Sequence, residues 1–216
     1  MSSTNIMTSN IYCIITTSLI QDNSTIRKQE YIKGILSLIN KCSNSNIKVI
    51  IVENNNLISS FLDDFNVDVN YTDTNNMPTT NYGIKEIHDV LKCIEKYNIK
   101  DDDYVIKMTG RYYLSDTSPF FDEICKLDKT NYEVIIKYGW WGDNKRIKHE
   151  NCFTGLICMK AKYIKQIDIP NDIKTCIEIR WAKVTIPLED SKICALDKLG
   201  LYMCPKCNNN TMFFEV

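Results

Sequence analysis

The apolar positions in the first half of the chain alternate between two patterns. One is a short unbroken run rich in β-branched residues, which is typical of a strand buried on both faces. The other places apolar side chains three or four residues apart, which is typical of a helix with one buried face. The runs predict strands at residues 11–19, 47–54, 67–72 and 104–108. The spaced positions predict helices at residues 25–42, 57–65 and 82–97. This alternation predicts an α/β fold with a mostly parallel central sheet and helices on both faces.

The second half of the chain is less regular. We expect a short helix beginning at Pro119, a strand at residues 132–138, an apolar segment at 152–159 and a helix at about 172–184 that Asn171 caps. No internal repeat and no Gly/Ser-rich linker divides the chain. The polar residues 1–10 are expected to form a flexible N-terminus, and residues 11–216 a single domain.

Charge and hydropathy narrow the function classes. Lys and Arg number 26 against 27 Asp and Glu, so no basic surplus indicates nucleic-acid binding, and a small polar ligand fits this balance better. The start of the chain lacks the basic and apolar segments of a signal peptide, and no later run reaches about 18 apolar residues. We therefore expect a cytoplasmic protein without membrane insertion; its oligomeric state is open.

The segment 101-DDDYVIKMTGRYYL-114 contains two candidate sites, one at each end of a predicted strand. Ligands of open α/β sheets bind beyond the carboxyl ends of the strands. Asp101, Asp102 and Asp103 precede the strand, so we expect them to form a solvated turn at the opposite edge. Thr109, Gly110 and Arg111 leave the strand at its carboxyl end, where a ligand is expected.

Polar residues gather at the carboxyl ends of the other predicted strands as well. They are Thr16, Thr17 and Ser18, then Glu53 and Asn54, then Thr72 and Asp73, with Asn81 and Gly83 ahead of the long helix. Lys107 and Arg111 add two positive charges four residues apart, which suit a diphosphate. The alternative is that both cations only pair with neighbouring acids. Gly110 permits close approach of a ligand or an unusual backbone angle.

Several common site motifs do not fit the sequence. No GxGxxG follows the first strand and no GxxxxGK[ST] is present, so neither the usual dinucleotide fold nor a P-loop enzyme is supported. The 204-CPKC-207 pair is half of a zinc ribbon, but a structural zinc site needs four ligands and no second CxxC or HxxxH occurs. We therefore predict no metal site.

The segment 107-KMTGRY-112 lies in a distinctive order of segments. Before it come IYCIITTSLI at 11–20, Arg27, IIVEN at 50–54 and NYGIKE at 81–86. In this order and spacing, residues 11 to about 160 resemble the GT-A-fold glycosyltransferases that carry a Lys-x-Thr-Gly-Arg-Tyr segment, which occur in glycan synthesis by microbes and large DNA viruses. The resemblance implies a single GT-A-like (Rossmann-like) domain, with a nucleotide-binding half at 11–114 and an acceptor-side half at 115–216. The sequence departs from the family at Tyr82, where such proteins often have Lys.

The resemblance also implies an activity. It is the transfer of a sugar from a nucleoside diphosphate sugar to a hydroxyl acceptor such as a glycan, in the host cytoplasm if the chain is viral. Common GT-A enzymes hold a divalent metal with a DxD after the fourth strand. Here KMTGR takes that place, so side-chain cations are expected to replace the metal, no cofactor is required, and the motif position does not support Mn²⁺ or Mg²⁺.

Roles for individual residues follow from this resemblance. The base and ribose of the donor are expected to bind Thr16, Thr17, Glu53 and Asn54. The departing diphosphate is expected to bind Lys107 and Arg111, with Arg27 as a further cation. Other expected donor-binding residues are Asn81, Thr109 and Gly110. Candidates for the catalytic base are Asp143 in the GWWGDNK loop, then Glu178, then Glu189 and Asp190; His149 is a further candidate to line that loop. Two alternatives remain: a non-catalytic nucleotide-sugar or glycan-binding module, and a nucleotidyltransferase.

Overall fold

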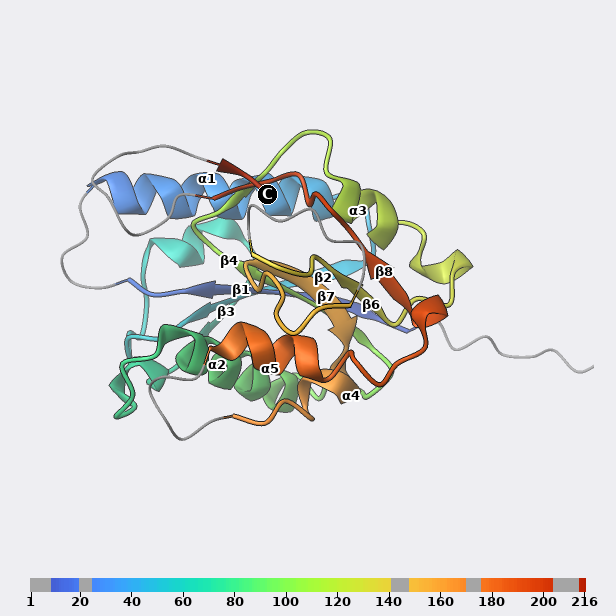
Figure 1. Cartoon of the computed structure of the whole chain (residues 1–216). Coiled ribbons are helices and arrows are strands. Elements are labelled where there is room, and N and C mark those ends of the chain that lie inside the picture. The colour runs from blue at the N-terminus through green and yellow to red at the C-terminus, as the bar shows by residue number, and fades with distance from the viewer. Residues whose placement is uncertain (1–8, 20–24, 141–147, 170–175, 204–213) are drawn as a thin grey trace, which may run out of the picture.

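A seven-stranded sheet lies at the centre of the molecule (Figure 1). The structure is a computed structural model that describes residues 9–19, 25–140, 148–169, 176–203 and 214–216. The strand order is β3-β2-β1-β4-β7-β6-β8. These strands are β1 (Ile11–Thr17), β2 (Ile47–Glu53), β3 (Asp68–Tyr71), β4 (Tyr104–Thr109), β6 (Val134–Ile136), β7 (Leu156–Lys160) and β8 (Ile193–Ala195).

The strand directions define two edges of this sheet. The neighbours β3, β2, β1 and β4 pair in parallel. Strand β7 is antiparallel to both β4 and β6, and β8 is parallel to β6. Every strand of the sheet except β7 therefore ends at the same edge, which we call the carboxyl edge; the other is the amino edge. The predicted α/β fold with a mostly parallel sheet is confirmed.

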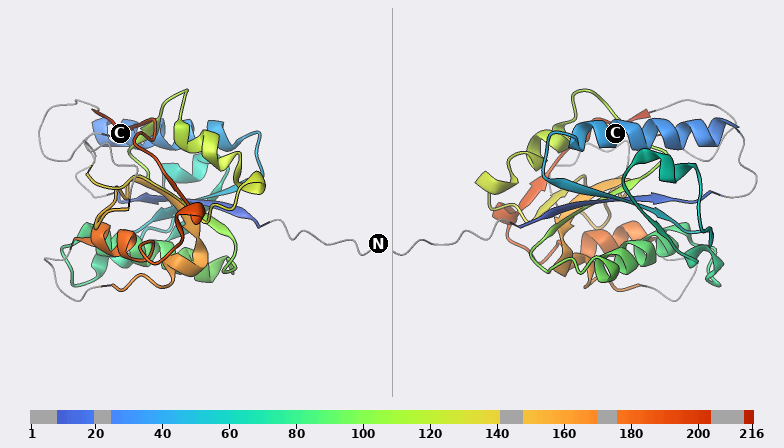
Figure 2. Two further views of the ribbon diagram at one scale, coloured as in Figure 1. Left: turned by 45° about the vertical axis from the view of Figure 1, so that its right-hand side comes forward. Right: turned by 180° about the vertical axis from the view of Figure 1, so that it is seen from behind.

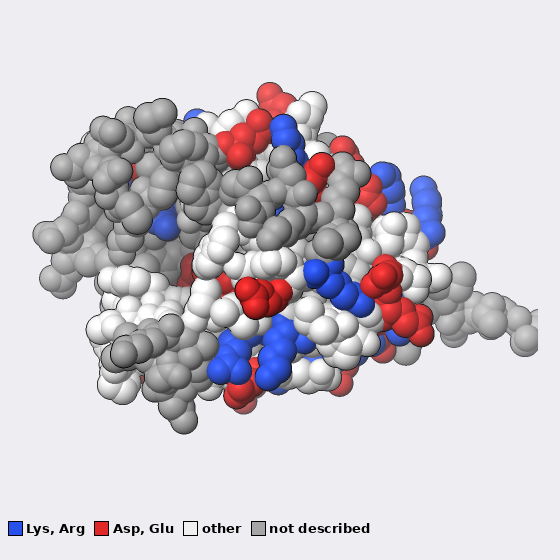
Figure 3. Space-filling model, in the orientation of Figure 1, with Lys and Arg blue, Asp and Glu red and all other residues white. Residues whose placement is uncertain are grey.

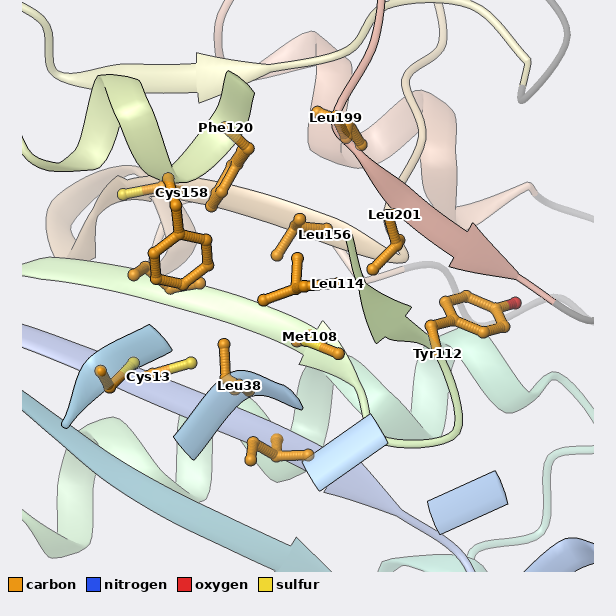
Figure 4. Packing of buried hydrophobic residues seen from close by; sticks show 14 of the residues in the cluster. Cys13, Leu38, Met108, Tyr112, Leu114, Phe120, Leu156, Cys158, Leu199 and Leu201 are labelled. Carbon is orange, nitrogen blue, oxygen red and sulfur yellow. The ribbon is translucent and has the colours of Figure 1, made fainter. Parts of the chain in front are cut away.

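Helices cover both faces of the sheet (Figures 1 and 2). The face under α1 (Thr25–Cys42) buries Ile35 and Leu38 against Met108, in a cluster of which Figure 4 gives a close view. The opposite face packs under α2 and α5, with Ile87 and Trp181 fully or almost fully buried. The remaining helical bounds are α2 (Tyr82–Lys96), α3 (Pro119–Ile124), α4 (Ala161–Ile164) and α5 (Ile177–Lys183), and 3₁₀ turns η1 (Phe61–Phe65), η2 (Thr74–Asn76), η3 (Leu127–Lys129) and η4 (Asp190–Lys192).

The strands and long helices of the first half lie where the apolar pattern predicts them. The helix predicted at 57–65 is shorter, because Ser60 caps a 3₁₀ turn at Leu62 and Asp63. In the second half, α5 begins at Ile177, and residues 170–175, with the proposed Asn171 cap, lie outside the described residues. The apolar segment at 152–159 yields β7, which starts only at Leu156.

A second, three-stranded sheet was not predicted. It contains β5 (Tyr113–Leu114), β9 (Leu201–Met203) and β10 (Phe214–Glu215), all antiparallel. Strands of two or three residues show no apolar period, so their pairing depends on contacts distant in sequence. This sheet joins the end of the chain to the residues that follow Arg111.

Charged side chains are mixed on the surface. Figure 3 shows acidic and basic residues interleaved over the described part of the face that carries α5 and β8, without an extended patch of one sign. None of the helices in the described ranges is both long and apolar enough to cross a membrane.

Candidate functional site

A cavity of about 280 Å³ opens beyond the carboxyl end of β4. Its walls come from the start of α2, the residues after β4, Trp140, the segment before β7, the start of α5 and β9. We call it the β4 pocket. The predicted residues Thr109, Arg111 and Glu178 line it together. Residues about 70 positions apart in the sequence therefore meet at the edge where ligands of α/β sheets bind.

Arg111 lines this pocket and also has one buried donor without a partner among the described residues. Its Nη2 donates to the Tyr112 hydroxyl at 3.2 Å, and its guanidinium carbon lies 5.0 Å from the centroid of that ring. Its Nε is buried and has no hydrogen-bond partner in the described part of the chain. Burial acts to lower the pKa of Arg111, but Tyr112, Tyr31 and Glu86 outweigh it and raise the pKa above its ordinary value. A charged group with an unpaired buried donor is costly. A guanidinium on a pocket wall also suits an anionic ligand.

Lys107 lies behind the pocket wall. Its side chain is 1% exposed, and its Nζ donates to Glu86 Oε2 at 2.8 Å, Thr109 Oγ1 at 3.0 Å and the Thr154 carbonyl at 2.9 Å. An ammonium has three donors, so all of them are engaged. Of the two interpretations of this lysine, the structure favours pairing with a neighbouring acid.

Glu86 is the partner that the sequence analysis did not single out. It lines the β4 pocket, and its Oε1 accepts hydrogen bonds from Thr16 at 3.1 Å and Thr109 at 3.3 Å. Burial acts to raise the pKa of Glu86, but Lys107 and the Thr16 hydroxyl outweigh it, so the pKa lies below its ordinary value. One ionised carboxylate thus joins the ends of β1 and β4 to α2. The sequence contained one signal for Glu86. It and Asp89, which is buried, are two acids three residues apart beside the apolar stripe of α2.

Glu178 reaches the pocket because two helices approach closely. A Cβ added at Gly83 in α2 would lie 2.2 Å from Ile177 Cγ2 in α5, so only glycine allows this approach. Glu178 is half-buried, and its Oε2 accepts a hydrogen bond from Cys176 Sγ at 2.8 Å. The sequence alone left it open whether Glu178 is an ordinary exposed helix residue; the structure puts it in the pocket wall.

The other base candidates lie elsewhere. Asp143 is outside the described residues, as are Cys204 and Cys207. Glu189 is exposed, and Asp190 is 92% exposed and pairs with Lys148 at 2.8 Å. His149 Nδ1 lies 2.8 Å from Asn151 Oδ1. Glu189, Asp190 and His149 are absent from the described lining of the β4 pocket.

The proposed nucleoside residues form a connected network at the ends of β1 and β2. The Thr17 hydroxyl lies 2.8 Å from the Val52 carbonyl and 2.7 Å from Glu53 Oε2. Glu53 is fully buried and also accepts from the Leu19 amide at 3.0 Å. Asn54 donates to Asp89 Oδ2 at 3.1 Å. These contacts fix the loop backbone, and their role toward a nucleoside stays a prediction.

Three further predicted residues have evident local roles. Asn81 Oδ1 caps α2 by accepting from the Gly83 and Ile84 amides. Arg27 pairs with Glu30 at 2.7 Å on the first turn of α1. Gly110 donates its amide to the Thr16 carbonyl at 2.9 Å, and a Cβ there would lie 2.9 Å from Thr17 Cγ2. Close approach to β1 therefore explains this glycine.

The opposite end of β4 holds the three aspartates in structural contacts. Asp103 is buried and accepts from the Asn10 and Lys100 amides, each at 2.9 Å. Asp101 pairs with Lys165 at 2.6 Å, and Asp102 with Lys160 at 3.3 Å. The three aspartates thus lie at the amino edge, as predicted, but Asp103 is buried, so the prediction of a solvated turn is wrong for this residue.

The donor set at the carboxyl end of β4 does not fit a metal of the DxD kind. Its charged members are Lys107, Arg111, Glu178 and a Glu86 carboxylate that is already paired. Among the described residues, no group of three or more His, Cys, Asp or Glu side chains is arranged to hold a metal ion. A larger groove of about 550 Å³ along β3 is also polar, but Lys92 and Lys96 pair within it with Asp73 and Asn70.

Comparison with known proteins identifies the fold. No family model matches the sequence, and no curated protein is similar to it in sequence. Among solved structures, a Bacillus anthracis protein designated a glucose-1-phosphate thymidylyltransferase matches at 13% identity and a TM-score of 0.55, over 89% of each chain. The 4-diphosphocytidyl-2C-methyl-D-erythritol synthase of Anaerococcus prevotii matches at 14% identity and a TM-score of 0.51, over 87% of this chain and 88% of that one. The galactosyltransferase LgtC, solved with donor and acceptor sugar analogues, matches at 9% identity and a TM-score of 0.47, over 86% of this chain and 73% of that one. At these identities the matches with a TM-score above 0.5 show the fold alone: a Rossmann-like α/β fold with a mostly parallel central sheet.

Proposed function

We propose that this chain is a glycosyltransferase that moves a sugar from a nucleoside diphosphate sugar to a hydroxyl acceptor in the β4 pocket. The observation that carries the proposal is that Arg111 and Glu178 line the same pocket beyond the carboxyl end of β4. A fixed cation suits a diphosphate leaving group, and a carboxylate suits an acceptor hydroxyl.

The diphosphate is assigned to Arg111. Guanidinium groups bind phosphate oxygens through parallel hydrogen bonds, and the stack of Arg111 on Tyr112 holds its plane in a fixed orientation. Lys107 acts through Glu86: their ion pair holds the hydroxyl of Thr16 and that of Thr109, and Thr109 lines the pocket. The base and ribose extend over the ends of β1 and β2, beside Thr17, Glu53 and Asn54, with Arg27 at the start of α1.

Glu178 is assigned as the base. In the transfer step the bond between the sugar carbon and the diphosphate oxygen breaks, and a bond to the acceptor oxygen forms. The acceptor hydroxyl proton passes to the Glu178 carboxylate, and the nucleoside diphosphate leaves with the bonding electrons, its charge compensated by Arg111. Side-chain cations thus replace a metal ion, so EDTA is expected to leave donor binding unchanged.

A thermal-shift panel of UDP, GDP, CDP and dTDP sugars tests the proposal. We expect one donor class to raise the melting temperature, because a ligand that binds only the folded state stabilises it. Glu178→Gln should keep that shift and lose sugar transfer. No stabilisation of the folded protein by any donor would reject the proposal.

A second candidate is a nucleotidyltransferase, favoured by the fold match with a TM-score of 0.55, which is named a glucose-1-phosphate thymidylyltransferase. It predicts stabilisation by a nucleoside triphosphate and release of pyrophosphate with a sugar 1-phosphate. A module without catalysis predicts donor binding with neither sugar transfer nor donor hydrolysis.

A further inference from the structure

Two large aromatic side chains lie exposed on the rim of the β4 pocket. Tyr82, on the first turn of α2, is 55% exposed, and Trp140, which follows β6, is 52% exposed. Trp181, by contrast, is 2% exposed in the core beneath α5. Aromatic side chains in contact with both solvent and a pocket are typical of ligand contacts rather than of core packing.

The interior of the same pocket continues this aromatic lining. Tyr112 and Phe153 stack with ring centroids 6.3 Å apart, and both line the cavity. Their neighbours in the wall are polar: Thr109, Arg111 and Glu178. The lining therefore combines aromatic rings with hydrogen-bonding groups. This pattern fits a ligand with an apolar face and a polar circumference, and a pyranose ring has both.

The size of the pocket limits what it holds. Small-molecule sites usually measure roughly 300–1,000 Å³, and at about 280 Å³ this cavity is at the lower end. A whole nucleotide sugar and its acceptor exceed that volume. Since the nucleoside is assigned to the ends of β1 and β2, the cavity and its rim are left for ring-sized groups close to Glu178.

We propose that the acceptor is a carbohydrate, and that Tyr82 and Trp140 bind the faces of its sugar ring so that one of its hydroxyls meets Glu178. The proposal rests on the proposed transferase function for the identity of the second substrate. The ring contacts themselves predict carbohydrate binding whether or not a donor is present. A protein or lipid hydroxyl would not require two aromatic side chains, each about half exposed, on the pocket that Glu178 lines.

The test measures transfer and donor hydrolysis together, with monosaccharides and oligosaccharides as acceptors and a serine peptide as the competing acceptor. Trp140→Ala and Tyr82→Ala should each lower the ratio of transfer to hydrolysis by about tenfold, the effect of one lost ring contact. Trp140→Phe and Tyr82→Phe should restore most of it. Ile58→Ala, at a 96% exposed apolar residue outside the pocket, is the matched control and should change neither rate.

Two outcomes would overturn the inference. One is an unchanged ratio in both alanine variants, and the other is preferred transfer to the peptide. If no donor binds, the transferase function fails separately, and the carbohydrate site is then tested by oligosaccharide quenching of tryptophan fluorescence. Quenching in the wild type that Trp140→Phe abolishes would support the site, and no quenching would reject it.

Discussion

The two ends of β4 carry similar densities of charge but differ in how that charge is satisfied. At the amino edge, Asp101, Asp102 and Asp103 are each paired with a lysine or with backbone amides. At the carboxyl edge, Arg111 keeps a buried donor without a partner in the described residues, next to a cavity. The three acids thus have their partners within the fold, whereas the Arg111 Nε has none among the described residues.

This difference shows why a metal-like motif is not by itself a site. Charges that the fold already satisfies gain little from a ligand, because the ligand would have to displace existing partners. A buried donor left unpaired costs free energy in the empty protein, which binding recovers. The following predictions probe this contrast, from the largest expected effect to the smallest.

The largest effect is expected for Glu86→Gln. It leaves the Lys107 ammonium, 1% exposed, without a charged partner. Breaking a buried ion pair by removing one partner costs about 3–5 kcal/mol, and we expect that loss in urea unfolding. Asp101→Asn at the amino edge is the matched control. Its side chain is 68% exposed and that of its partner Lys165 is 40% exposed, so about 1 kcal/mol or less is expected. Equal losses would contradict the difference between the two edges.

The next effect concerns donor affinity. Arg111→Ala removes the group assigned to the diphosphate, and a hydrogen bond to a charged group is worth about 1.5–3 kcal/mol, or roughly 10–150-fold in dissociation constant. Calorimetric titration with the donor found by thermal shift measures it. Asp101→Ala, which only frees Lys165, should leave affinity unchanged. Loss of donor binding in a folded Asp101→Ala protein would show that the donor binds at the amino edge, and that its assignment to the carboxyl end of β4 is wrong.

Strand polarity was the part of the site that could be predicted from the sequence. Apolar runs fixed where β1, β2 and β4 end, and Thr16, Thr109 and Arg111 follow those ends by chain direction alone. Lys107 shows the limit of this reasoning. Its position in the strand indicates a cation at the carboxyl edge, but whether its Nζ faces a ligand or an acid depends on Glu86 in another element.

The second half of the fold was harder to predict for a related reason. Strands β5, β9 and β10 have two or three residues each, too few to show a period. Glu178 enters the pocket only because Gly83 allows α5 to approach α2, a contact between residues 94 positions apart in chain numbering. Nothing in the local sequence around Glu178 indicates that contact.

A smaller effect is expected for Gly34→Ala. Gly34 in α1 supports the backbone at the carboxyl end of β4, because an added Cβ would lie 2.1 Å from the Gly110 carbonyl oxygen and 2.4 Å from that of Tyr112. Backbone atoms yield little, and overpacking costs about 1–3 kcal/mol. Thermal unfolding measures the loss. The control is Leu36→Ala, at a 43% exposed position of the same helix. A Gly34→Ala protein as stable as wild type would mean that α1 does not fix the Arg111 segment.

The smallest effect is expected at the amino edge, for Asp102→Asn. The hydrogen bond from Lys160, then the charges of Lys160 and Lys162, hold the pKa of Asp102 below its ordinary value. Its side chain is 73% exposed, so solvent screens the pair and we expect a loss of about 0.5 kcal/mol or less near neutral pH. Because the folded-state pKa is the lower one, this stabilisation is complete above the unfolded value of about 3.9 and disappears as pH falls through the folded-state pKa. Urea midpoints of wild type and variant should therefore converge in acid. A difference that instead grows in acid would show that Asp102 is strained rather than stabilised by its lysines, and would remove the contrast between the two ends of β4.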